Sequence, residues 1–110
     1  MRARSRPPGM IATVYAVFAD QAEAERIAET VIEERLAACA NILSPCRSIY
    51  RWQGKVERAG EVPALFKTAR AEALIARIAE LHSYDVPAAV AWPIEDAHEP
   101  YADWVKANSG

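Results

Sequence analysis

The stretch Cys39–Lys67 reads CANILSPCRSIYRWQGKVERAGEVPALFK, and it decides the fold. Two long apolar-rich runs flank a turn at Gln53-Gly54, where glycine supplies the positive φ that a tight hairpin turn requires. At about 3.3 Å per residue, an unbroken first arm from Ala38 to Trp52 would reach roughly 45 Å. A compact domain of this length has a radius of gyration of only about 13 Å. The hairpin is therefore expected to protrude, and a second copy of the same chain is the simplest cover for it.

Both arms of this hairpin contain residues that disturb a regular ladder. Ser44-Pro45 interrupts the first arm, because proline cannot donate a ladder hydrogen bond, and the strand should bend there. In the returning arm we expect a bulge or kink at Arg58-Ala59-Gly60. Pro63 predicts either an edge position or a residue whose N–H side faces away from its partner.

The sequence before the hairpin predicts a strand and a helix. Ile11–Ala19 is a nearly continuous apolar run rich in β-branched and aromatic residues, typical of a central strand covered on both faces. Asp20 then caps a helix that reaches about Leu36, with Glu23 in a capping-box arrangement and assigned to the solvent face. The predicted buried face comprises Ala24, Ile27, Ala28, Val31, Ile32 and Leu36.

The sequence after the hairpin predicts a helix over 71–83, a strand over 86–94 and a last short helix opened by Glu99-Pro100. The element order predicts one α+β domain over residues 10–110. Its fold is ferredoxin-like, a βαββαβ antiparallel sheet with two helices on one face and an extra C-terminal helix. Because the strands are apolar on both faces, the uncovered face predicts a partner.

Composition and charge narrow the classes of function. The chain has 110 residues, 52% hydrophobic and 25% charged, with a net charge of −2. Residues 1–9 carry three arginines and no acid, and we interpret them as a disordered basic tail. Without that tail, 10 basic side chains face 15 acidic ones, which argues against nucleic acid as a partner. The apolar stretch from Met10 to Ala19 is too short for a membrane span.

The two cysteines bear on the compartment. Cys39 and Cys46 lie seven residues apart on one predicted strand, so their Cα atoms would be about 23 Å apart. A disulfide requires less than about 7 Å. Free thiols without a signal peptide predict a cytoplasmic protein.

Several segments, in order, resemble one known family. ERLAACANIL, RSIYRWQGKVE, EVPALFKT, LHSYDVPAAVAWPI and YADWV are similar to the CutA divalent-cation tolerance proteins, from Met10 to about Lys106. The resemblance implies a homotrimer in which the long hairpins wrap around neighbouring subunits. It also implies a non-enzymatic role linked to tolerance of copper and other divalent cations.

The resemblance directs attention to metal ligands. Copper-binding members place a cysteine near the end of the first strand and histidines at the end of the second helix. Here Ala16 and Leu81 occupy two of those positions, and only His82 matches. Nothing in the sequence has the close ligand spacing of a self-contained site. The candidate ligands for Cu(II) or another divalent cation are therefore His82 and Cys39, with a helix-end role for His82 and a buried apolar role for Cys39 as the alternatives.

A second candidate site is the cleft between subunits. By the resemblance, it is lined by Tyr50, Trp52, Glu61, Lys67, His82 and Tyr84. These residues predict either a small-ligand pocket or simple interface anchors, with Glu61 and Lys67 neutralising each other. A ligand there would make the protein a trimeric sensor of a small metabolite, similar to the PII signalling proteins. A small hydrolase is the least favoured reading, because no nucleophile–base spacing or glycine-rich phosphate loop is present.

Overall fold

The computed structural model describes residues 10–110, so the predicted basic tail at 1–9 lies outside it. The elements follow in the order β1 Ala12–Phe18, α1 Gln21–Glu33, β2 Cys39–Ile42, β3 Cys46–Trp52, β4 Lys55–Thr68, α2 Ala71–Leu81, β5 Ala89–Pro93 and α3 Glu99–Asn108. This confirms the predicted order, with the first hairpin arm divided into β2 and β3. None of the helices described has both the length and the apolar character needed to cross a membrane.

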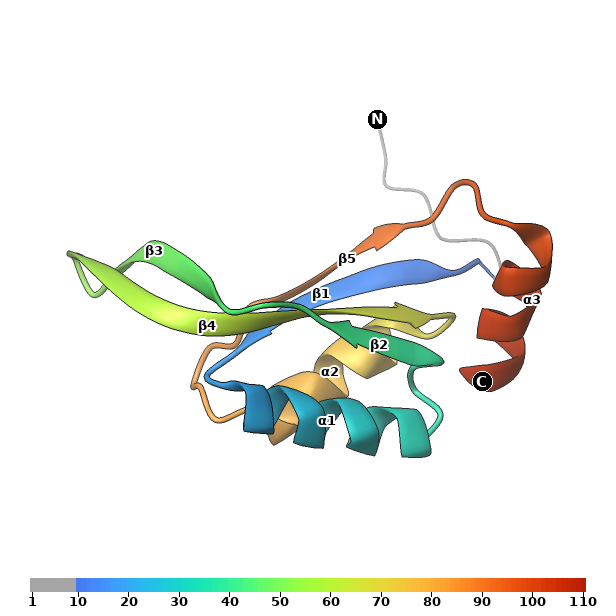
Figure 1. Cartoon of the computed structure of the whole chain (residues 1–110), viewed down its shortest axis with the longest axis horizontal. Coiled ribbons are helices and arrows are strands. Elements are labelled where there is room, and N and C mark those ends of the chain that lie inside the picture. The colour runs from blue at the N-terminus through green and yellow to red at the C-terminus, as the bar shows by residue number, and fades with distance from the viewer. Residues whose placement is uncertain (1–9) are drawn as a thin grey trace.

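The strands form an antiparallel sheet in the order β2-β4-β1-β5, and β3 continues along β4. Helices α1 and α2 lie on one face, α3 lies at one end, and the β3–β4 hairpin extends beyond the other end (Figure 1). The ferredoxin-like α+β fold is thus confirmed. Within residues 10–110, no helix covers most of the sheet face opposite α1 and α2.

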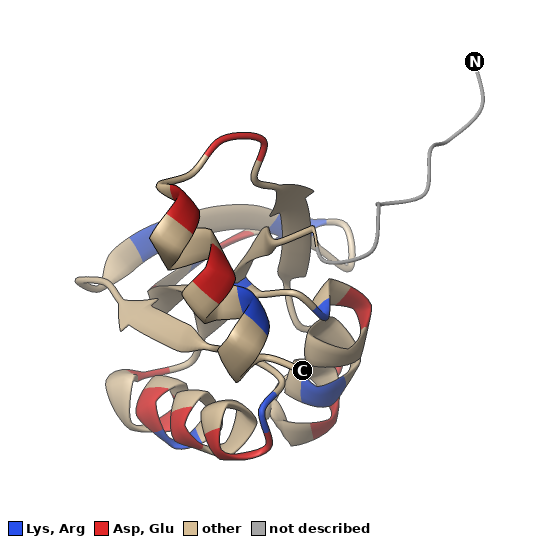
Figure 2. Cartoon of the chain, turned by 90° about the vertical axis from the view of Figure 1, so that its right-hand side faces the viewer, with Lys and Arg blue, Asp and Glu red and all other residues tan. Residues whose placement is uncertain are grey.

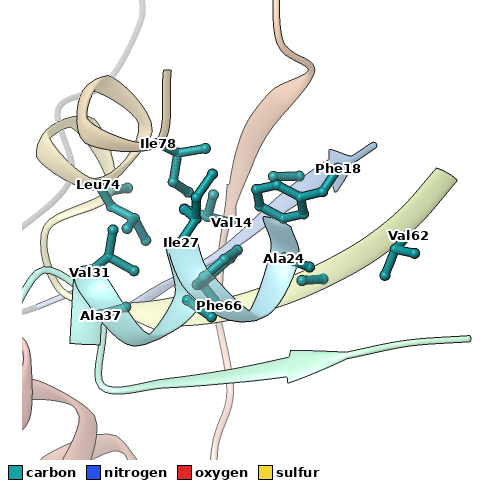
Figure 3. Packing of buried hydrophobic residues seen from close by; sticks show 14 of the residues in the cluster. Val14, Phe18, Ala24, Ile27, Val31, Ala37, Val62, Phe66, Leu74 and Ile78 are labelled. Carbon is teal, nitrogen blue, oxygen red and sulfur yellow. The ribbon is translucent and has the colours of Figure 1, made fainter. Parts of the chain in front are cut away.

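The core lies between the sheet and the two helices (Figure 3). Within the sheet, Val14 of β1 lies opposite Phe66 of β4. Ile27 of α1 and Leu74 and Ile78 of α2 pack against them, and all five side chains are fully buried. Burying an aliphatic or aromatic side chain of this size stabilises a fold by about 1.5–3 kcal/mol. This layer fixes the positions of the strand ends that carry the candidate site.

Helix α1 ends three residues before the predicted boundary at Leu36. Arg35 adopts the left-handed conformation with φ 61°, and the Leu36 N–H donates to the Val31 carbonyl at 2.9 Å. This is a Schellman ending, in which glycine is the usual left-handed residue. The Arg35 guanidinium donates to the carbonyls of Ala107 and Gly110, at 2.6 and 3.2 Å. These contacts tie the end of α1 to α3.

Two residues of α1 differ in burial from what the sequence predicts. Ile32 is 37% exposed, although it was assigned to the buried face. Glu23 is only 6% exposed, although it was assigned to the solvent face. Its burial reflects hydrogen bonds to a distant loop, described below.

A one-residue bulge separates β2 from β3. Ile42 lies opposite Ala64, whereas Cys46 lies opposite Glu61. The first arm therefore uses four residues where β4 uses three, and the extra residue falls at Ser44-Pro45. This confirms the predicted interruption. A bulge turns the following side chains to the other face of the sheet.

The prediction of a bulge at Arg58-Ala59-Gly60 is wrong. Pairing between β3 and β4 runs without a shift from Cys46 opposite Glu61 to Trp52 opposite Lys55, so β4 is regular through that segment. One extra residue in the first arm already supplies the bend. The turn at Gln53-Gly54 is confirmed, with φ of 50° and 82°, so that both residues are left-handed as in a type I′ turn.

Pro63 does not lie at a sheet edge, because β4 is flanked by β1 and β2. Its carbonyl accepts a hydrogen bond from the Leu43 N–H at 2.9 Å. The nitrogen and carbonyl of a strand residue point to the same side. The missing donor therefore faces the point where β2 ends and the bulge begins, away from Val17 of β1.

Candidate functional site

A buried carboxylate joins the end of β1 to the loop after α2. The Asp20 side chain accepts from the Glu23 N–H at 2.8 Å, as an N-cap should. The Glu23 carboxylate accepts from the Ala19 N–H and from the Ser83 N–H, each at 2.9 Å. In a capping box it would bond to the N-cap residue itself, but here it reaches one residue earlier. Burial opposes the charge, yet the hydrogen bonds from Ser83 and Ala19 hold the pKa of Glu23 below its usual value.

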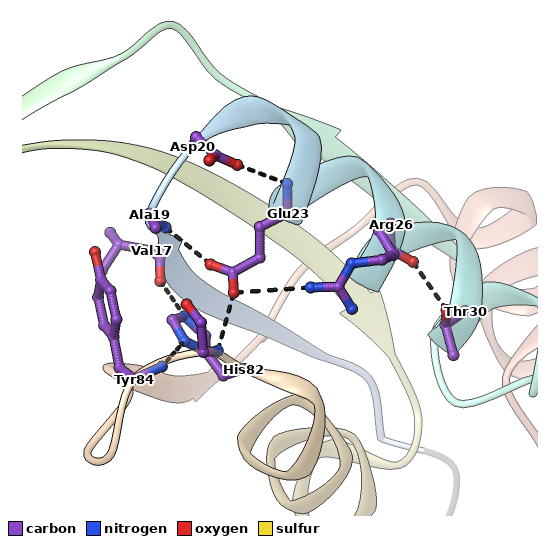
Figure 4. A network of polar contacts seen from close by, with 9 residues as sticks. Val17, Ala19, Asp20, Glu23, Arg26, Thr30, His82 and Tyr84 are labelled. Carbon is purple, nitrogen blue, oxygen red and sulfur yellow. Dashed lines mark hydrogen bonds and ion pairs between the residues drawn. The ribbon is translucent and has the colours of Figure 1, made fainter.

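His82 lies beside this carboxylate, at the residue where α2 ends (Figure 4). Its Nε2 is 2.7 Å from the carbonyl oxygen of Val17, which can only accept, so Nε2 carries the proton. Nδ1 accepts from the Tyr84 N–H at 3.1 Å. The ring is 9% exposed and stacks on Phe18 with centroids 5.2 Å apart. This arrangement assigns a neutral imidazole with both nitrogens engaged.

Tyr84 extends the network to the hairpin. Its hydroxyl donates to the Glu61 carboxylate at 2.9 Å, and its ring lies 4.6 Å from that of His82. Burial, together with this carboxylate, raises the pKa of Tyr84 to about 12. Glu61 is 8% exposed. The chain thus brings together three of the six residues predicted for the cleft, namely Glu61, His82 and Tyr84.

The other three predicted cleft residues form no side-chain hydrogen bond with this network in the described chain, although Tyr50 is near enough for its charge to contribute to the raised pKa of Tyr84. Tyr50 and Trp52 are on β3, roughly half exposed. Lys67 is six residues from Glu61 on β4, which corresponds to about 20 Å. The two charges therefore cannot neutralise each other within one subunit.

Cys39 and His82 lie on different faces of the sheet. Cys39 is opposite Lys67, on the face turned away from α1 and α2, whereas His82 packs on Phe18 of the core. The Cys39 thiol lies 3.2 Å from the Tyr101 hydroxyl, and this contact, with burial, raises the pKa of Tyr101 to about 12. Within residues 10–110, no three His, Cys, Asp or Glu side chains converge on a point where a metal ion could be held. One subunit therefore does not fit the copper site that the resemblance implies.

The uncovered sheet face is apolar near β5. Tyr15 and Trp92 stack there with centroids 6.3 Å apart, and Val90 and Trp92 are about half exposed. Acidic positions gather elsewhere, along α1 and around α3 (Figure 2). The surface therefore divides into a charged outer side and an apolar sheet face.

A groove of about 520 Å³ lies on the hairpin, lined by Arg47, Ser48, Ile49, Arg58, Ala59 and Gly60. None of the predicted cleft residues line it. No salt bridge within the described chain involves Arg47 or Arg58. Two guanidinium groups beside an apolar floor can hold an anionic group, but the sequence pattern did not single this groove out.

Comparison with known proteins fixes the family. Residues 12–108 match the family model described as CutA1 divalent ion tolerance protein. The chain belongs to the CutA1 family. It is 45% identical over 94 residues to the divalent-cation tolerance protein CutA of Pyrococcus horikoshii, covering 84% of this chain and 91% of that one.

Two further CutA proteins are similar over most of the chain. Human Protein CutA is 36% identical over 101 residues, which cover 90% of this chain and 56% of the human one, so the chain spans little more than half of that relative. The structure of the periplasmic divalent cation tolerance protein CutA from Archaeoglobus fulgidus superposes with a TM-score of 0.87 at 34% identity, covering 92% of this chain and all of that one. The CutA1 fold thus extends over nearly all of the described chain.

Sequence reasoning missed Glu23 as a part of the site. The capping signal at Asp20 was visible, and an acidic residue three positions later was read as a cap alone. The Glu23 carboxylate is held by the N–H of Ser83, 60 residues later in the chain. No local sequence pattern predicts that contact.

Proposed function

We propose that this chain contributes to tolerance of divalent cations as a non-enzymatic homotrimer in the cytoplasm. Family membership over residues 12–108 supports the role, because the relatives carry that description in their names. The free thiols of Cys39 and Cys46 support the compartment. The Archaeoglobus fulgidus relative is named as a periplasmic protein, so the compartment of this chain needs its own test.

The trimer is supported by the surface that a single subunit leaves exposed. Trp92, 47% exposed, and Val90, 51% exposed, lie on the bare sheet face, and Ile49, 64% exposed, lies on the hairpin. At about 25 cal/mol per Å² of apolar area, covering such side chains stabilises an assembly by several kcal/mol. The free edges of β3 and β5 also offer unpaired backbone groups to a neighbour.

Any metal contact would involve more than one subunit. Cys39 is the candidate ligand that we retain, because it lies on the partly exposed sheet face where another copy can supply further donors. Thiolate is a soft ligand suited to copper. His82 is not retained as a ligand, since its lone pair is engaged.

A second candidate function is binding of a small metabolite in the inter-subunit cleft, as in a PII-like sensor. The observation that favours it is the hydrogen-bonded pair of Tyr84 and Glu61 near the base of the hairpin. With Tyr50 and Trp52 from the hairpin and Lys67 from a neighbouring subunit, this pair would combine aromatic, acidic and basic groups in one pocket.

The assembly is tested by sedimentation velocity at micromolar concentration. We expect three times the chain mass of 12.1 kDa for the wild type and for the control Ile32→Glu, which alters an exposed residue of α1. Trp92→Glu, which puts a charge on the bare face, should release monomers. A monomeric wild type would refute the trimer.

The role itself is tested by growth of a bacterial strain that lacks its own CutA-type protein, on medium containing Cu(II). Expression of this chain should restore growth, and Trp92→Glu should restore less. Equal growth with and without the chain would contradict the proposed role. A thermal-shift screen of anionic metabolites, repeated with Trp52→Ala, tests the alternative.

A further inference from the structure

We infer that His82 is a positioning residue that holds the Tyr84 side of the cleft in place, and that it does not bind a metal ion. The inference rests on the proposed cleft for its functional meaning. The contacts of His82 that support it all lie within one subunit.

The hydrogen-bond partners of His82 fix its protonation state. Val17 offers only a carbonyl oxygen at 2.7 Å, so Nε2 must be the donor. Tyr84 offers only an N–H at 3.1 Å, so Nδ1 must be the acceptor. A ring that donates at Nε2 and accepts at Nδ1 is the neutral tautomer protonated at Nε2. Metal ligation needs a free lone pair on one nitrogen, and here the single lone pair points at a backbone N–H.

The imidazole ring of His82 is also buried. His82 is 9% exposed and lies between Phe18, at 5.2 Å, and Tyr84, at 4.6 Å, measured between ring centroids. A metal ion reaching Nδ1 would have to displace Tyr84, and one reaching Nε2 would leave the Val17 carbonyl without its donor. Either change leaves a buried backbone group without a hydrogen-bond partner, which opposes metal binding at this ring.

The hydrogen bond between His82 and the Tyr84 N–H helps to position the Tyr84 side chain. The N–H groups of two successive residues after α2 are both held: Ser83 by the Glu23 carboxylate and Tyr84 by His82. With its backbone fixed in this way, Tyr84 directs its hydroxyl onto Glu61 at 2.9 Å. His82 therefore sets the place of one hydrogen-bonding group in the cleft without lining the cleft as a ligand.

The first test uses the full-length wild-type protein labelled with ¹⁵N. Long-range ¹H–¹⁵N spectra should show His82 as one neutral tautomer protonated at Nε2, with a ¹⁵N–¹⁵N coupling between Nδ1 and the Tyr84 amide. Both signals should be unchanged by equimolar Zn²⁺. The opposite tautomer, an absent coupling, or a Zn²⁺-induced shift of either ring nitrogen would overturn the inference.

Two variants separate positioning from simple packing. His82→Asn places an amide oxygen where Nδ1 lies, so the Tyr84 amide should exchange with solvent within about threefold of the wild-type rate. His82→Phe keeps the stacked ring but no acceptor, and exchange there should rise by at least about tenfold, the factor expected for one lost hydrogen bond. His98→Phe, at the other histidine, is the control and should change nothing at Tyr84. Equal exchange in the Asn and Phe variants would overturn the positioning role.

These measurements need neither a ligand nor a trimer. If no metabolite binds, the tautomer and the Tyr84 exchange remain as predicted, and only the proposed cleft fails. If the tautomer is wrong, the positioning role fails while family membership and assembly stand.

Discussion

Replacing Glu23 by Gln should destabilise the fold by about 2 kcal/mol at pH 7. The carboxylate accepts two backbone hydrogen bonds, from Ala19 and Ser83, while 6% exposed. The amide oxygen of Gln can keep one of them, but its NH₂ group then meets the other N–H donor. A hydrogen bond to a charged group contributes about 1.5–3 kcal/mol, and the neutral side chain is easier to bury, so the net loss lies near the lower part of that range.

The contribution of Glu23 to the free energy of unfolding should depend on pH, in a direction set by its lowered pKa. Because the folded-state pKa of Glu23 is lowered, its contribution is present above the unfolded pKa of about 4.3 and is lost as pH falls through the lower folded value. The difference between wild type and Glu23→Gln should therefore be constant from pH 8 to 6 and shrink in acid. The apparent stability of an oligomer depends on subunit concentration, so the wild type and Glu23→Gln must be compared at the same concentration.

The assay is urea unfolding followed by tryptophan fluorescence at matched subunit concentrations, at pH 7 and again at acid pH. Glu25→Gln is the matched control, because that carboxylate lies exposed on the same helix and contacts only Gln21. It should unfold like the wild type. A loss below about 0.5 kcal/mol for Glu23→Gln, the size of an ordinary surface substitution, would refute the reasoning.

Three other changes test separate features. Gln53→Asn should stabilise the hairpin by about 0.5–1 kcal/mol in thermal unfolding, since Asn accepts the φ of 50° better than Gln and Asn-Gly suits a type I′ turn; no gain would contradict that turn geometry. The pKa of Tyr84, about 12, lies above its unfolded value near 10, so wild-type stability should fall between pH 10 and 12 relative to Tyr84→Phe, and parallel curves would speak against the hydroxyl's contact with Glu61. Arg35→Gly should relieve the left-handed strain yet free α3, so hydrogen exchange in α3 should increase; unchanged exchange would show that other contacts hold that helix.

Local patterns predicted the fold well because its signals are local. Alternation identified the hairpin, Gln53-Gly54 its turn, and Pro45 its interruption, and each depends on residues adjacent in the chain. The ending of α1 was misplaced because Arg35 adopts a conformation that glycine usually signals.

The candidate site was predicted less completely, since it depends on contacts between distant segments. The residue types at Glu61, His82 and Tyr84 were identified through the family resemblance. Their arrangement was not, because the tautomer of His82 is set by Val17, 65 residues earlier. The burial of Glu23 has the same origin.

The bulge at Ser44-Pro45 gives the first hairpin arm two opposite rules for tolerated substitutions. Before it, even-numbered positions such as Ala40 face the core, beside Phe66. After it, even-numbered positions such as Tyr50 share the face of Glu57, and the odd ones turn the other way. A saturation mutagenesis map of residues 39–52 should therefore show a two-residue periodicity that reverses its phase at Ser44-Pro45. Substitutions preserve that phase, whereas deleting one residue there would remove the bulge, leave Cys46 opposite Glu61 and give one unbroken periodicity along the arm.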